Sequence, residues 1–255
     1  MIVATWNVNS ILVRLPHLIE WIKANKPNVV CLQETKAVDG RFPCSQIEEL
    51  GYNCNFYGEK TYNGVAILSD RPLQEVRKGF IGDDADQPKR LIEALVDSTY
   101  IVNVYIPNGS EVGSAKYKFK LEWLSRLKRH IAERYNLRER VVLCGDFNIA
   151  TDDIDCYDAE AVRGTIMVSD AERAAIAQIK EMGFVDTFRM HNTEGGQFSW
   201  WDYRMGAFRR NMGFRIDHIW ASKPLSEACT RAWIDKAPRK LERPSDHAPV
   251  LAEFS

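Results

Sequence analysis

The chain has 255 residues, of which 45% are hydrophobic and 27% charged, and it carries a formal net charge of −1. This composition is ordinary for a globular protein and excludes a disordered or low-complexity chain. A sandwich or barrel of this length is commonly undivided, so we expect a single catalytic domain over residues 1–255. Its core is large enough to fold without disulfide bonds or a structural metal.

The net charge gives no support for a nucleic-acid partner, but the charges are unevenly distributed. Between Arg204 and Arg243, ten Lys or Arg residues stand against four acids. Contacts to phosphate need only one positive face, so this stretch permits DNA binding. A solvated surface of mixed charge accounts for the count equally well. Charge alone leaves both interpretations open.

Cysteine spacing and the N-terminal sequence bear on location. The six cysteines form no C-x-x-C pair: Cys31, Cys44, Cys54, Cys144, Cys156 and Cys229. We expect reduced thiols in a cytoplasmic protein rather than a disulfide framework or a zinc site. Asn7 comes too early for a signal peptide, and no run approaches the roughly 18 apolar residues of a membrane span. The sequence thus predicts an intracellular protein with no membrane partner.

The predicted elements are short apolar strands and a few amphipathic helices. In chain order they are strand Ile2–Asn7, helix Leu15–Ala24, strands Asn28–Gln33, Val65–Leu68, Leu91–Val96 and Ile101–Ile106, helix Tyr117–Tyr135, strand Val141–Leu143, helix Asp170–Met182, and strands Ile216–Ala221 and Val250–Phe254. A Ser169/Glu172 capping box begins the last helix and Gly183 ends it. Several successive strands have connections too short for crossover helices. This favours two packed sheets over a doubly wound parallel sheet.

Polar residues follow or precede several of these strands, where a strand core would not tolerate them. The clusters are Trp6-Asn7-Val8-Asn9, Gln33-Glu34-Thr35-Lys36, Tyr105-Ile106-Pro107-Asn108-Gly109, Cys144-Gly145-Asp146-Phe147-Asn148, Arg215-Ile216-Asp217-His218 and Ser245-Asp246-His247-Ala248-Pro249. If these strand ends share one edge of the sheets, the side chains converge in one polar cleft. Each alone has a structural explanation as a turn former or core residue, but together they are hard to attribute to chance.

The oxygen-bearing side chains of this cleft suit a hard divalent cation. Mg²⁺ prefers oxygen ligands, one or two of them carboxylates, with substrate phosphate and water completing its shell. Glu34, Asp146, Asn148 and Asp246 supply that chemistry. No Cys/His spacing suits zinc.

The same cleft holds groups that hydrolysis of a phosphodiester requires. The reaction needs a deprotonated water and stabilisation of charge on the phosphorus centre. Asp217 and His247 can form a pair in which the carboxylate fixes the imidazole tautomer. Asn7, Tyr105 and Asn148 can donate hydrogen bonds to phosphoryl oxygens.

In these segments the sequence resembles the exonuclease III branch of the endonuclease/exonuclease/phosphatase superfamily, over nearly its whole length. The motifs named above occur in the family's order, together with Asn63-Gly64-Val65-Ala66-Ile67. The resemblance implies a four-layered α/β sandwich, in which helices flank two packed, mainly antiparallel mixed sheets. It also implies dependence on Mg²⁺ or Mn²⁺ and a duplex DNA substrate with abasic sites, nicks or recessed 3′ ends. We expect the enzyme to act as a monomer.

Site roles follow from the resemblance residue by residue. It makes Glu34 the principal metal ligand, assisted by Asp246 and Asn7, with Asp146 and Asn148 also near the ion. Asp146 matches the proton-transfer acid, and Asn148 matches the group that stabilises the transition state.

The remaining catalytic positions lie around the scissile phosphate. Tyr105 matches a tyrosine at that phosphate, and His247 a histidine that contacts it and is oriented by Asp217. Whether Asp146 or the His247–Asp217 pair generates hydroxide stays open.

Residues 197–204 resemble the loop that lines the family's pocket for a baseless sugar. Trp200, Phe214 and Ile216 match the apolar wall of that pocket, while Arg204 and Asn108 are expected to contact DNA. An apolar pocket admits a flipped-out deoxyribose, although core packing explains such residues equally well.

Two features near this loop affect substrate choice and binding. Met167 falls where relatives commonly have a small residue, and its bulk could restrict an internal abasic nucleotide more than a 3′ terminus. Lys116, Lys118 and Lys120 could bind phosphate, although a solvated helix face is the plainer interpretation.

Two alternatives remain. The chain could be another phosphoesterase of the superfamily, such as a sphingomyelinase, an inositol-phosphate phosphatase or a pancreatic-type deoxyribonuclease, which has a histidine in place of Tyr105. It could also be a non-catalytic DNA-binding member, although no predicted ligand is missing.

Overall fold

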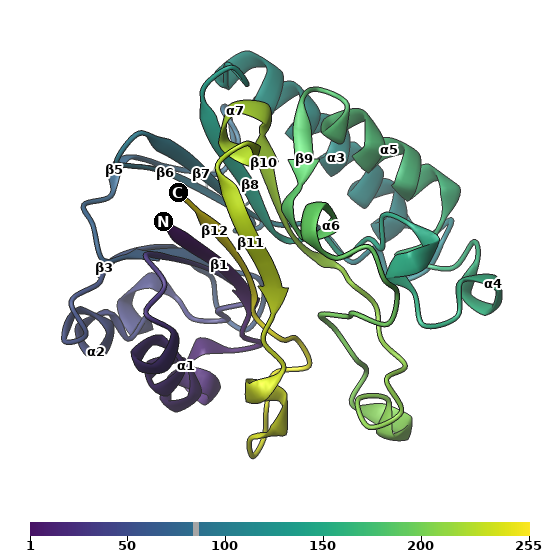
Figure 1. Cartoon of the computed structure of the whole chain (residues 1–255), viewed down its shortest axis with the longest axis horizontal. Helices are drawn as coiled ribbons and strands as arrows, with labels where there is room; N and C mark the ends of the chain where they lie inside the picture. Colours follow the sequence, from purple (N-terminus) through teal and green to yellow (C-terminus); the bar gives the residue numbers. More distant parts are fainter. Residues whose placement is uncertain (84–86) are drawn as a thin grey trace.

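The computed structural model describes residues 1–83 and 87–255, and in them two six-stranded sheets pack face to face (Figure 1). The first sheet has the order β11 (Cys229–Ile234), β12 (Val250–Phe254), β1 (Ile2–Asn7), β2 (Val29–Gln33), β4 (Val65–Ser69) and β3 (Asn53–Tyr57). The second has the order β5 (Gln74–Lys78), β6 (Leu91–Val96), β7 (Thr99–Tyr105), β8 (Arg140–Asp146), β10 (Asp217–Ser222) and β9 (Phe184–Asp186). The mixed two-sheet architecture predicted from the sequence is confirmed.

Parallel pairing occurs once in each sheet, between β1 and β2 and between β7 and β8; the other strand pairs of the described residues are antiparallel. A parallel pair needs a crossover connection, and a long helix supplies it in both cases. These helices are α1 (Ile11–Asn25) and α3 (Ala115–Arg134).

Three apolar layers bind the sandwich together. One lies between the sheets, where Cys31 and Ile67 of the first meet Val142 and Ile219 of the second. A second lies between the first sheet and α1, with the short α2 (Cys44–Glu48) beside it. The third lies between the second sheet and the helices α3 and α5 (Asp170–Lys180). Figure 1 shows these helices on the two outer faces, giving four layers.

Short elements connect these layers. They are α4 (Ala159–Val162), α6 (Thr187–His191), α7 (Lys223–Ser226) and the 3₁₀ turns η1 (Asp39–Arg41), η2 (Asp153–Asp155), η3 (Arg204–Gly206) and η4 (Ala237–Lys240). None of the described helices is long and apolar enough to cross a bilayer.

The predicted elements are found with small shifts in their bounds. The capping box of α5 is confirmed: Ser169 Oγ accepts the Glu172 N–H at 3.4 Å, and Glu172 Oε2 accepts the Ser169 N–H at 3.2 Å. Gly183 lies beyond the helix, which ends at Lys180. The strands that the sequence did not predict are β3, β5, β9 and β11, and each is an edge strand of its sheet.

Strand direction brings the predicted polar residues to one end of the sandwich. The parallel strands β1, β2, β7 and β8 finish there, while β10 and β12 run the other way and start there. In register, Asp146 pairs with both Tyr105 and Asp217. The loops preceding β10 and β12 project from this same end (Figure 1).

Candidate active site

The side chain of Asn7 links the two sheets at this end. It is fully buried, and its amide nitrogen donates to Glu34 Oε1 and to Asp146 Oδ2, both at 2.9 Å. Its oxygen accepts the Asn9 N–H at 3.0 Å, which fixes the orientation of the amide. One side chain therefore joins a carboxylate of the first sheet to a carboxylate of the second.

Glu34 follows β2 in the left-handed region, with φ 48°. Tyr105 OH donates to its Oε1 at 2.8 Å, and Lys36 Nζ lies 2.8 Å from its Oε2. Burial alone would raise the pKa of Glu34, but the Lys36 ammonium and the hydrogen bonds outweigh it and lower the pKa. Burial and the Glu34 carboxylate raise the pKa of Tyr105 well above its ordinary value. At neutral pH a charged carboxylate thus faces a neutral hydroxyl donor.

A second acid, Asp246, is connected to Glu34 through Lys36 and Asn9. Lys36 Nζ donates to Asn9 Oδ1 at 2.7 Å, and Asn9 Nδ2 donates to Asp246 Oδ1 at 2.9 Å. Trp200 Nε1 donates to the other oxygen of Asp246 at 3.0 Å. The ammonium and amide donors between the two acids mark a position that favours positive charge.

The pair of Asp217 and His247 approaches Asp146 from the other side. His247 Nδ1 lies 2.8 Å from Asp217 Oδ2, and His247 Nε2 lies 3.8 Å from Asp146 Oδ2. Burial alone would lower the pKa of His247, but Asp217 and Asp146 raise it to about 10. Burial raises the pKa of Asp146 to about 7, against the opposing effect of His247. The imidazole is therefore charged at neutral pH, and Asp146 titrates near neutrality.

Asn148 is held beside Asp146 by its own loop, in a left-handed conformation with φ 51°. Its backbone N–H donates to Asp146 Oδ1 at 2.8 Å, and its Nδ2 donates to Asp146 Oδ2 at 3.2 Å and to the Ile106 carbonyl at 3.0 Å. Its Oδ1 accepts from Asn108 Nδ2 at 3.0 Å. Both amides are therefore orientated before any substrate binds.

These residues fit a divalent cation. Among the residues that the structure describes, Asp146, Asp217 and His247 bring ligand atoms within 4.8 Å of one another. His247 is a poor ligand there, because it is protonated at neutral pH and its Nδ1 is bonded to Asp217. Glu34 and Asp246 offer oxygen atoms alone, which is the donor set that Mg²⁺ prefers. The Glu34 side therefore fits the ion better.

An apolar wall adjoins the polar groups. The Trp200 ring lies 5.9 Å from the Phe214 ring and 6.5 Å from the His247 ring, between centroids. Met167 and the fully buried Ile216 belong to the same apolar cluster as Trp200 and Phe214. Met167 therefore packs in the cluster that includes the residues of this wall.

Residues 4–247 match the Endonuclease/Exonuclease/phosphatase family. The chain belongs to this family. Exodeoxyribonuclease III of Haemophilus influenzae is 34% identical to it over 98% of both chains. The 3′ phosphatase NExo from Neisseria, solved with a product DNA hairpin, is 40% identical with a TM-score of 0.96, covering 100% of this chain and 99% of that one. An AP endonuclease from Archaeoglobus fulgidus is 38% identical with a TM-score of 0.97 and the same coverage.

The predicted kinship with exonuclease III nucleases is confirmed, and with it a hydrolase that acts on phosphate esters. The strand ends bring together the segments to which the resemblance assigned site roles. Of the predicted site residues, Arg204 alone stands apart, on an exposed turn of the loop before β10.

Some basic residues of this family member do not lie where the sequence suggested. Arg215 and Arg239, counted in the basic stretch, are buried, and Arg215 is paired with Asp155 and Asp186 inside the protein. They cannot form part of a positive surface. Lys120 is also fully buried, so it is neither a solvated charge nor a surface contact to phosphate.

Arg90, Lys36 and Asn9 also contact the site, although no individual role was predicted for them from the sequence. Arg90 precedes β6 and holds its guanidinium carbon 4.4 Å from the centre of the Tyr105 ring. It also lines a cavity of about 310 Å³ with Tyr105, Asn108 and Lys116. Arg90 contacts Tyr105, and Asn9 contacts Lys36 and Asp246, across large separations in sequence that no local pattern indicates. Lys36 also pairs with the nearby Glu34.

Proposed function

We propose that the chain is a Mg²⁺-dependent DNA repair phosphodiesterase of the exonuclease III type, acting in the cytoplasm as a monomer. It hydrolyses phosphodiesters at abasic sites, 3′-blocking phosphates, or 3′-terminal nucleotides of duplex DNA. The observation that carries the proposal is the Asn7 amide, which holds Glu34 and Asp146 together while the Asp217–His247 pair adjoins Asp146. An oxygen-ligand set beside a proton carrier and a cation is the equipment that phosphate-ester hydrolysis requires.

The charges divide the catalytic roles. Glu34 and Asp246 would hold the metal, which would neutralise charge on the phosphate. His247, whose pKa Asp217 and Asp146 raise, is protonated at neutral pH and donates to a phosphoryl oxygen. Asp146 is left as the group that accepts the proton of the attacking water, because its pKa of about 7 suits that task. Asn148 and Tyr105 exchange their hydrogen bonds to Asp146 and Glu34 for bonds to the oxygens that gain charge in the transition state.

Substrate choice depends on the apolar wall. The relatives of nearly equal similarity include a 3′ phosphatase and an AP endonuclease, so likeness does not decide between them. Met167 has φ 71°, its N–H donates to Glu172 Oε1 at 3.1 Å, and its carbonyl accepts the Ala150 N–H at 2.9 Å. These bonds fix the backbone at Met167, and its side chain packs in the apolar cluster with Trp200 and Phe214, which leaves less room for an internal abasic sugar. We therefore propose that processing of 3′ termini predominates.

A panel of duplexes tests the proposal. One carries an internal abasic site, one a 3′-phosphate at a nick, and one a recessed 3′ end. We expect turnover with Mg²⁺ and none with a chelator, with higher kcat/KM on the 3′-phosphate than on the abasic site. Hydrolysis of a sphingolipid or inositol phosphate in place of DNA would favour another member of the superfamily. DNA binding without turnover would favour a non-catalytic member.

A further inference from the structure

Helix α3 carries a lysine inside the protein. Lys120 is fully buried, and its ammonium forms an ion pair with the equally buried Glu172 of α5. Burial lowers the pKa of Lys120, while Glu172 and Asp146 oppose that shift. An unpaired ammonium buried in this way would be strongly destabilising. The three acceptors that bond it therefore indicate what the lysine does.

The other two acceptors of Lys120 are backbone carbonyls of candidate site residues. Its Nζ donates to the Asn148 carbonyl at 2.8 Å and to the Asn108 carbonyl at 3.1 Å. Asn108 and Asn148 also bond to each other through their side chains, at 3.0 Å. The ammonium thus clamps the two loops that follow β7 and β8. Asn148 needs this support, because its φ of 51° lies in a region that non-glycine residues seldom occupy.

Glu172 fixes the lysine and extends the connection to the apolar wall. One carboxylate oxygen accepts from Lys120 and from the Met167 N–H, while the other accepts from Ser169 Oγ at 2.6 Å and from the Ser169 N–H. Ser169 Oγ also lies 2.6 Å from Tyr117 OH, back on α3. The lysine is therefore held from one side and holds the catalytic loops on the other.

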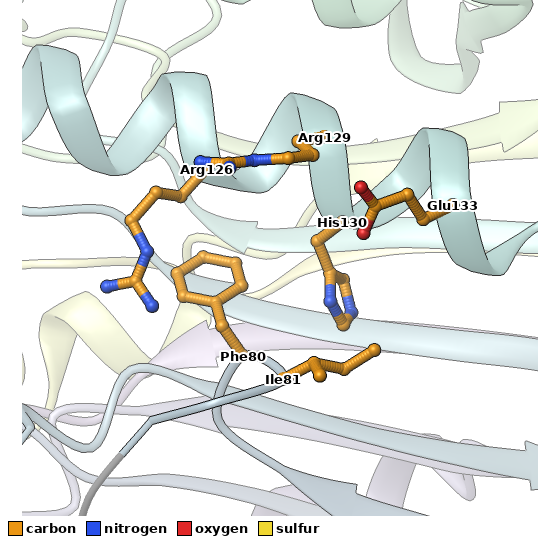
Figure 2. Close-up of a pocket in the computed structure, with 6 residues that line it drawn as sticks. All are labelled: Phe80, Ile81, Arg126, Arg129, His130 and Glu133. Carbon is orange, nitrogen blue, oxygen red and sulfur yellow. The ribbon is translucent and has the colours of Figure 1, made fainter.

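A second buried ion pair on the same helix provides an internal comparison. His130 and Arg134, near the far end of α3, pair with the buried Glu93 of β6. His130 extends toward Phe80 and Ile81, on the outer side of the second sheet (Figure 2). None of these contacts reaches a candidate site residue. A buried ion pair seldom adds net stability over apolar packing, so stability alone explains neither pair.

Resting on the function proposed above, we infer that Lys120 is a positioning residue for catalysis. It holds the carbonyls of Asn108 and Asn148 so that the Asn148 amide meets the phosphate in the transition state. Lys120 does not touch the substrate. Its loss therefore lowers kcat while KM changes little, because a misplacement of about 1 Å can cost up to about a hundredfold in rate.

The main test is a double-mutant cycle measured as kcat on the 3′-phosphate duplex. We expect Lys120→Met to reduce kcat by roughly 10- to 100-fold in the wild-type background. In an Asn148→Ala background, the same change should reduce kcat by less than about threefold, because the group it positions is absent. Equal losses in both backgrounds would overturn the inference.

A second variant separates positioning from folding. Lys120→Met combined with Glu172→Gln removes the uncompensated carboxylate and keeps one acceptor oxygen, which can serve either the Met167 or the Ser169 N–H group but not both. We expect its melting temperature to recover toward wild type while kcat stays low, because the two carbonyls still lack their donor. Recovery of kcat together with stability would show that Lys120 only supports folding, and the inference would fail.

The matched control is Glu93→Gln, compared with Glu172→Gln. Both remove the charge of a buried carboxylate that pairs with α3, so both should lower the melting temperature. Only Glu172→Gln should lower kcat, and an equal loss from Glu93→Gln would contradict the positioning role. If the wild-type chain turns over no DNA substrate, the function proposed above fails; if it does and the Lys120 variants match it, only this inference fails.

Discussion

Glu34 and Asp146 both accept a hydrogen bond from the Asn7 amide, yet their surroundings shift their pKa values in opposite directions. Glu34, on the first sheet, faces Lys36 and the Tyr105 hydroxyl, and its pKa is lowered. Asp146, on the second sheet, is 1% exposed and has Asp217 nearby, and its pKa is raised to about 7. Paired titratable groups whose environments separate their pKa values commonly divide acid–base roles between them.

The opposite pKa shifts indicate that the Glu34 side and the Asp146 side of the site have different functions. A carboxylate that stays charged at every physiological pH is suited to hold a cation. A carboxylate that titrates near neutrality is suited to carry a proton. The five predictions that follow test this division and the groups around it.

The largest expected effect comes from changing the two acids themselves. Asp146→Asn should lower kcat by about 10²- to 10⁴-fold, the usual contribution of a proton-transfer group. Glu34→Gln should lose activity through weaker metal binding, so excess Mn²⁺ should restore it in part. Activity measured across a metal titration separates the two, with melting curves to verify folding. Recovery of activity in Asp146→Asn at high metal concentration would contradict the proton-transfer role of Asp146.

Changing Asp217 tests whether the histidine is held as a cation. In Asp217→Asn the pKa of His247 should fall from about 10, because its largest favourable partner is lost. Activity should then decline as pH rises above this new, lower pKa, by roughly tenfold or more at pH 9 for a hydrogen bond to a charged donor. The measurement is a pH–rate profile against wild type. An unchanged alkaline limb would contradict the role of Asp217.

Protonation of His247 also affects the stability of the folded protein. The raised pKa of His247 contributes stability that is fully present below its unfolded value and is lost as pH rises through about 10. Asp217→Asn should therefore narrow the difference in melting temperature between pH 7 and pH 10.

The sequence predicted central elements and polar clusters better than it predicted edges and buried charges. Every interior strand was found, because each is an apolar run bounded by turn residues. The edge strands β5 (Gln74–Lys78) and β3 (Asn53–Tyr57) were missed, since one neighbour and greater exposure allow polar residues such as Arg77 and Asn55. Edge strands are often polar because this discourages pairing with other chains.

The candidate site likewise contains residues that the sequence indicates and residues that it does not. Glu34 and Asp146 stand out because a charged residue at the end of a buried strand, or directly after it, is conspicuous in the sequence. Lys120 does not, because its partners lie on other elements and a lysine on a helix is usually solvated. Lys36 does not either, although Glu34 is only two residues away, because a lysine on a loop is usually solvated. The pKa difference between the acids depends on those partners, so no sequence pattern could reveal it.

Opening the apolar wall should change substrate choice and leave the division between the acids intact. Met167→Gly enlarges the wall and suits the left-handed backbone at this position. We expect kcat/KM on the abasic duplex to rise about tenfold relative to the 3′-phosphate duplex, as for a change of a few methylenes in a pocket. The pH–rate profile on the 3′-phosphate should not move. A shifted profile would mean that the wall also sets the pKa of Asp146.

The smallest effect at neutral pH, and the most direct test of the Glu34 side, is expected from Lys36→Met. The Lys36 ammonium is the largest influence that lowers the pKa of Glu34, so without it burial should raise that pKa. At pH 8 Glu34 remains ionised, and the Mg²⁺ concentration for half-maximal activity should change by less than about threefold. At pH 5.5 protons compete for Glu34, and the variant should need more Mg²⁺ than wild type.

Isothermal titration of Mg²⁺ at both pH values measures this, with Lys23→Met on the exposed face of α1 as the control. Since Asp146 keeps its own surroundings in the variant, the limb of the pH–rate profile near 7 should persist at saturating metal. Loss of that limb would mean that Glu34 and Asp146 titrate as one unit.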